Sequence, residues 1–82
     1  MDVKSIIKQF IVTEMMHELS QNILEDNEAL IENGVIDSMN LLKLVAFIEK
    51  NFRIQVDEDD LDIDNFRTVT TMTDFITRKM RT

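Results

Sequence analysis

One serine stands where chemistry could occur. In the stretch GVIDSMNLLKL, residues 34–44, Ser38 follows Asp37 and opens a run of helix-forming residues. Either residue could cap the first amides of that helix, and replacing a serine cap with alanine typically costs about 1 kcal/mol. The other interpretation is that the protein presents the Ser38 hydroxyl to partners. The surrounding sequence has to decide between them.

A serine hydrolase is the first chemistry to test. A nucleophilic serine needs a general base within reach, and the chain has a single histidine, His17, in the first predicted helix. The sequence also lacks the Gly-x-Ser-x-Gly turn that exposes such a nucleophile. We therefore assign no catalytic residue, expect no enzyme activity, and place His17 at the surface or the core boundary.

Calcium binding is the second chemistry to test. In the acidic stretch DEDDLDIDNF, Asp60, Asp62 and Asp64 occupy positions 1, 3 and 5 of a possible calcium loop. Position 6 should be glycine but is Asn65, and position 12 should be glutamate but is Thr71. The chain has no cysteine and hence no thiolate ligand. The sequence favours a solvated acidic loop, and we assign no metal.

Three segments show helical periodicity and would position Ser38. Apolar residues recur every three or four positions over residues 2–19, over residues 38–51 and from Thr68 onward. The residues predicted to face the core are Val3, Ile6, Ile7, Phe10, Ile11 and Met15 in the first helix, Leu41, Leu42, Leu44, Val45, Ile48 and Phe52 in the second, and Val69, Met72, Phe75, Ile76 and Met80 in the last.

The segments between the predicted helices lack this helical periodicity. Residues 20–37 follow no single period, so we predict a long loop attached to the core by its aliphatic residues, a length often found in functional loops. Residues 52–56 are predicted to be an extended linker, and one short helical turn is expected around Leu61. The fold class is therefore all-α, a small four-helix bundle of three main helices and one short helix.

Size and composition limit the function further. The 82 residues suit a single domain, 1–82, and the net charge of −7 argues against nucleic-acid binding. No apolar run approaches the roughly 18 residues of a membrane span. The N-terminal residues do not resemble a signal peptide. We expect a soluble, cytoplasmic monomer.

The order of motifs resembles the phosphopantetheine-binding carriers, the family of acyl, peptidyl and D-alanyl carrier proteins. The resemblance rests on GVIDSM, then LLKLVAFIEKNFRIQV, then DNFRTVTTMTDFI, over about residues 34–76. It implies an acyl-carrier-like bundle in which Ser38 carries a covalent 4′-phosphopantetheine group. The arm would supply the thiol that a cysteine-free chain lacks, and a phosphate there would meet the positive end of a helix dipole.

The resemblance also implies partners. A phosphopantetheinyl transferase would modify Ser38, with Asp37 contributing to its recognition, and acyl- or aminoacyl-loading enzymes and downstream synthases would then dock. Met39 is a candidate docking residue, the alternative being a half-buried core position. Lys43 is another, because the predicted second helix carries only Glu49 as an acid, against Lys43 and Lys50.

This charge pattern departs from the strongly acidic second helix of carriers in fatty acid biosynthesis. Partner choice depends on such patterns, so we favour a stand-alone acyl or aminoacyl carrier in a specialised polyketide or nonribosomal-peptide pathway. The competing interpretation is a helical protein-interaction module without a cofactor.

Overall fold

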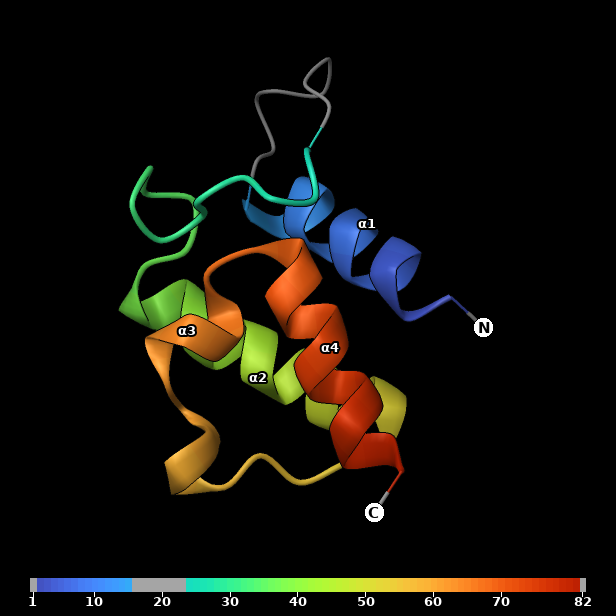
Figure 1. The fold of residues 1–82 in the computed structure, drawn as a ribbon. Coiled ribbons are helices and arrows are strands. Elements are labelled where there is room, and N and C mark those ends of the chain that lie inside the picture. Colours follow the sequence, from blue (N-terminus) through green and yellow to red (C-terminus); the bar gives the residue numbers. More distant parts are fainter. Residues whose placement is uncertain (1, 16–23, 82) are drawn as a thin grey trace.

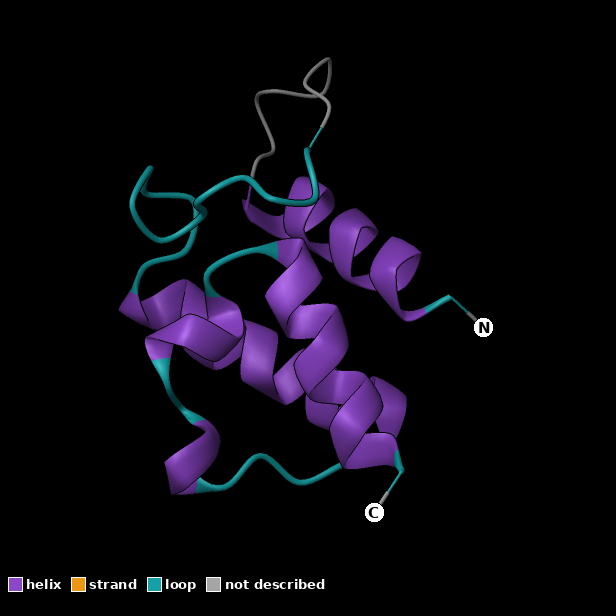
Figure 2. Cartoon of the chain, in the orientation of Figure 1, coloured by secondary structure: helices purple, strands orange, loops and turns teal. Residues whose placement is uncertain are grey.

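The computed structural model describes residues 2–15 and 24–81, and in this part of the chain it is helical without strands (Figures 1 and 2). The elements in chain order are α1 (Val3–Met15), α2 (Ser38–Phe52), a 3₁₀ turn (Glu58–Asp60), α3 (Ile63–Phe66) and α4 (Val69–Met80). The predicted all-α bundle of three main helices and one short helix is thereby confirmed. The last predicted residues of the first helix, with His17, lie outside the described residues.

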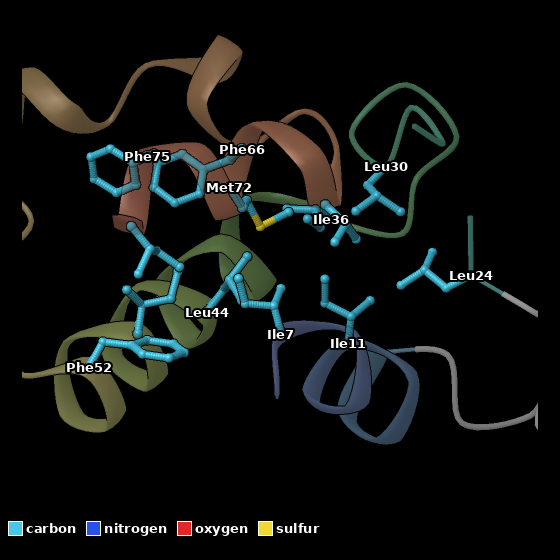
Figure 3. Packing of buried hydrophobic residues seen from close by; sticks show 13 residues of the cluster. Ile7, Ile11, Leu24, Leu30, Ile36, Leu44, Phe52, Phe66, Met72 and Phe75 are labelled. Carbon is cyan, nitrogen blue, oxygen red and sulfur yellow. The ribbon is translucent and has the colours of Figure 1, made fainter. Parts of the chain in front are cut away.

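Helix α4 is the centre of the bundle, since it packs against α1, α2 and α3. The side chains that meet there form one apolar core (Figure 3). Phe66 of α3 meets Phe75 of α4 edge to face, with ring centroids 5.6 Å apart. The buried residues are Ile7, Ile11, Leu24, Leu30, Ile36, Leu44, Ile48, Phe52, Phe66, Val69, Met72, Phe75 and Ile76.

Local sequence explains where α4 begins and which face it buries. The Thr68 hydroxyl accepts a hydrogen bond from the Thr71 amide, and the Thr71 hydroxyl accepts one from the Thr68 amide, forming a capping box. The predicted start at Thr68 is confirmed. Two core assignments are wrong, because Met80 is 47% exposed and Leu42 is 67% exposed. The helical spacing of both residues is correct, but the neighbouring elements in the described part of the chain leave them exposed.

The segment before α2 is a loop fastened to the helices. Leu24, Leu30 and Ile36 are buried in the core, which confirms that aliphatic residues attach this loop to the core. The Leu30 amide donates to the Arg67 carbonyl at 2.9 Å. Asp26 adds a polar attachment, because its carboxylate accepts from the ammonium groups of Lys4 and Lys8 on α1.

The acidic segment after α2 contains two short helical pieces rather than one turn around Leu61. The 3₁₀ turn ends just before Leu61 and α3 starts just after it, while Leu61 is 45% exposed. The predicted linker, residues 52–56, is only partly correct: Phe52 still belongs to α2 and Arg53 adopts a left-handed conformation, φ +55°, so only residues 54–56 lie outside helix and turn. The Val56 amide there donates to the Glu49 carboxylate at 2.9 Å, which ties the linker to α2. None of the helices in residues 2–15 and 24–81 has the length and apolar character needed to span a bilayer.

Candidate functional site

The cap of α2 is Asp37, not Ser38. Asp37 has extended backbone angles, φ −108° and ψ −173°, and its carboxylate accepts a hydrogen bond from the Asn40 amide at 2.8 Å. Ser38 is the first residue of the helix. The interpretation of Ser38 as the cap is therefore wrong, because the neighbouring carboxylate already bonds the first-turn amide that a Ser38 cap would contact.

The Ser38 hydroxyl is consequently available. The side chain is exposed, and its oxygen has no hydrogen-bond partner among the described residues. The backbone amides of Ser38 and Met39 likewise have no acceptor in the described part of the chain. Unpaired amides at a helix N-terminus favour a bound or attached anion. A phosphodiester on Ser38 therefore fits this position.

The chain just before the serine is held in place by short-range bonds. The Asn40 side-chain amide reaches back and donates to the Val35 carbonyl at 3.1 Å. Gly34 adopts φ +84°, a left-handed conformation that glycine reaches without strain. The Gly34 amide donates to the Ile31 carbonyl. The turn and the cap together fix the direction in which α2 starts, and with it the backbone position of Ser38.

An apolar notch of about 150 Å³ lies beside the hydroxyl. The loop before α2 and the first turn of α2 build one side of it, and α3, more than 20 residues further along the chain, builds the other. The lining residues are Ile31, Ile36, Asp37, Ser38, Leu41 and Ile63. The contribution of Ile63, 55% exposed on the four-residue helix α3, was missed from the sequence, because only the tertiary fold brings α3 next to Ser38.

The other predicted site residues lie on exposed positions around Ser38. Met39 is 70% exposed, so the interpretation of Met39 as a half-buried core residue is wrong. Lys43 is exposed one helical turn further along α2. Asp37 thus lies directly before α2, and Met39 and Lys43 lie in the same helix as Ser38. The recognition and docking roles of these three residues stay predictions.

The acidic segment shows no sign of a metal centre. Within residues 2–15 and 24–81, no group of three or more histidine, cysteine, aspartate or glutamate side chains is arranged to hold a metal ion. Asp60 instead pairs with Lys79 at 2.8 Å, and the ammonium holds the pKa of this carboxyl below its ordinary value. Asp62 caps α3 by accepting from the Asp64 amide. The carboxylates of Asp60 and Asp62 therefore take part in local ion pairing and helix capping.

Comparison with known proteins gives one informative match. No protein-family model matches the chain. A curated protein from Bacillus anthracis, acyl carrier protein AsbD, is 35% identical to this chain over 66 residues. The alignment covers 80% of this chain and 72% of that protein.

Proposed function

The chain belongs to the acyl carrier protein family, and from this premise we propose that it is a stand-alone carrier that holds biosynthetic intermediates on a 4′-phosphopantetheine arm attached to Ser38. The observation that carries the proposal is the Ser38 hydroxyl, which is exposed and without a partner among the described residues at the start of α2. A serine kept for capping would be hydrogen-bonded to the helix. Here Asp37 performs that role.

Attachment would be a phosphoryl-group transfer from coenzyme A. The Ser38 oxygen forms a bond to the pantetheine-bearing phosphorus, the bond from that phosphorus to the nucleotide breaks, and 3′,5′-ADP leaves. The proton of the hydroxyl passes to a base of the transferase. The arm supplies a thiol that carries acyl groups as thioesters. The chain itself therefore performs no catalysis in this role.

Two structural features at the start of α2 support attachment of the arm to Ser38. The unpaired amides of Ser38 and Met39 stabilise the negative charge of the phosphodiester. The Asp37 cap and the Asn40 bond to the Val35 carbonyl keep the start of α2 rigid while the transferase works on it. Cargo on a long tether then reaches several active sites at high effective concentration.

The proposed cargo is an acyl or aminoacyl group of a specialised pathway of the polyketide or nonribosomal-peptide type. The support is the charge of α2, which carries Lys43 and Lys50 against Glu49 alone. The proposed partners are a phosphopantetheinyl transferase, a loading enzyme and downstream synthases. We propose that the protein works as a monomer in the cytoplasm.

The test is to weigh the intact protein after incubation with coenzyme A and a broad-specificity phosphopantetheinyl transferase. The expected result is a gain of one phosphopantetheinyl group that is absent in Ser38→Ala. Ser5→Ala is the matched control, since Ser5 is also an exposed serine of a helix, and it should keep the gain. Unchanged mass in a folded wild-type protein would overturn the proposal and favour the cofactor-free interaction module.

A further inference from the structure

The lysines of the protein fall into two groups. Lys4, Lys8 and Lys79 each pair with an aspartate at 2.8 to 3.0 Å. Lys43 and Lys50 are exposed on α2 and form no ion pair with any residue that the structure describes. A helix with uncompensated positive charge is unexpected in a chain of net charge −7. The two groups differ in what they can offer a partner.

The two free lysines share one helical face with exposed apolar side chains. Successive exposed residues of this face are three or four positions apart, the spacing that places side chains in one stripe of a helix; they are Met39, Lys43, Ala46 and Lys50. Met39 is 70% exposed and Leu42 is 67% exposed, both on this stripe. We call it the α2 face, defined as Met39, Leu42, Lys43, Ala46 and Lys50.

The acidic residue of α2, Glu49, forms no ion pair with Lys43 or Lys50 among the described residues, and two ammonium groups outnumber its one carboxylate. Glu49 directs a carboxylate oxygen to the Val56 amide at 2.9 Å. It therefore stabilises the linker after the helix. The α2 face presents large apolar groups flanked by ammonium groups, next to the start of the helix where Ser38 lies.

We propose that the α2 face docks partner enzymes whose contact surface carries apolar side chains flanked by carboxylates. A net charge of −7 would by itself attract basic surfaces, so the local charge reverses the preference that the whole chain suggests. This inference rests on the proposed function, because an enzyme that acts at Ser38 must approach the start of α2. Apolar contact supplies affinity, and complementary charge supplies partner choice and association rate.

The test measures binding of two synthetic amphipathic helical peptides to the protein. Both carry the same leucine stripe, flanked by glutamate in one and by lysine in the other. Methyl NMR of protein labelled at methionine reports where they bind, since Met39 is exposed on the α2 face, Met72 is fully buried and Met80 is exposed on α4. The glutamate helix should shift the Met39 signal, leave Met72 and Met80 unchanged, and bind about tenfold more tightly than the lysine helix at low salt.

Charge variants give the decisive comparison. The double variant Lys43→Glu, Lys50→Glu should reverse the preference, whereas Arg78→Glu, Arg81→Glu makes the same change of net charge on exposed positions at the end of α4 and should not. The preference should fade near 1 M salt, where the screening length is about 3 Å. Equal or tighter binding of the lysine helix, or shifts at Met80, would overturn the proposal. The mass gain at Ser38 is measured separately, so each proposal can fail without the other.

Discussion

At the residue scale, neighbouring side chains at the start of α2 have separate tasks. Asp37→Ala should lower the free energy of unfolding by about 1 kcal/mol, because the first-turn amide of Asn40 loses its acceptor. Asp37→Asn keeps an acceptor and should recover most of the loss. Urea denaturation followed by circular dichroism measures both.

Ser38→Ala should leave the free energy of unfolding within about 0.5 kcal/mol of wild type, since its hydroxyl bonds no described residue. The same urea titration measures it, and the mass assay tests attachment in parallel. A loss as large as that of Asp37→Ala would show that Ser38 has a capping role after all. Stability and modification should thus respond to different residues of one dipeptide.

Gly34 illustrates a conformational requirement in the turn that leads to Ser38. At φ +84°, an added Cβ would meet no atom within 4 Å, so strain in the backbone is the only penalty. Gly34→Ala should cost about 1 kcal/mol, and Gly34→Asn should cost less because asparagine tolerates left-handed angles. Thermal unfolding of the three proteins provides the measurement; equal midpoints would contradict the assignment.

The sequence identified Ser38 as the important residue but could not separate its role from that of Asp37. Aspartate and serine are almost equally good caps, so the local preference for either is the same. The choice depends on backbone angles at one peptide unit, which the packing of the preceding loop determines. Leu30 and Ile36, buried in the core, anchor this loop.

At the element scale, Asp26 joins α1 to the loop and should make stability depend on pH. Hydrogen bonds from Lys8 and then Lys4 hold the pKa of the Asp26 carboxyl below its ordinary value of 3.8. A carboxyl with a depressed folded-state pKa stabilises the fold above its unfolded-state pKa, and this contribution disappears as the pH falls through the folded-state pKa. The stabilisation should therefore be complete above about pH 5 and be lost progressively below pH 4.

Asp26→Asn isolates this contribution. The variant should melt at a lower temperature than wild type at pH 6, and the two melting temperatures should converge as the pH falls toward 2. Some acid dependence should remain in the variant, because hydrogen bonds from Ser5 and Lys79 also lower the pKa values of Asp2 and Asp60. A constant difference across this pH range would contradict the assigned ion pairs.

Helical periodicity was sufficient to predict the main helices and insufficient to predict which edge of each apolar stripe is covered. Leu42 and Met80 fit the spacing of the core residues and are nevertheless exposed. A wide stripe is compatible with several rotations of a helix, and only the position of the neighbouring element selects one. The notch beside Ser38 could not be predicted for the same reason, since Ile63 reaches it from a separate short helix.

At the scale of the whole molecule, the loop before α2 belongs to the core as fully as the helices do. Leu24 and Leu30 are buried against the same cluster as Ile7 and Ile11 of α1 (Figure 3). A small domain has few buried side chains and a total stability of only about 5 to 15 kcal/mol. A loop that contributes to such a core cannot loosen without weakening the helices.

Leu30→Ala tests this coupling. Leu30 is fully buried, so removing its side chain should cost about 2 to 5 kcal/mol through lost burial and the remaining cavity. Far-ultraviolet circular dichroism at the helix band reports α1, α2 and α4, and not the loop that holds Leu30. A lower midpoint of helix melting in a loop variant therefore demonstrates one cooperative unit.

The matched variant is Leu42→Ala, which makes the same side-chain change at a site 67% exposed on α2. If burial decides stability, the loop variant should lower the midpoint of helix melting much more than the helix variant, although only the second alters a helix. Equal midpoints would mean that the loop folds independently of the bundle. A carrier of that kind would present Ser38 on a support that moves, and the fixed geometry at the start of α2 would lose its physical basis.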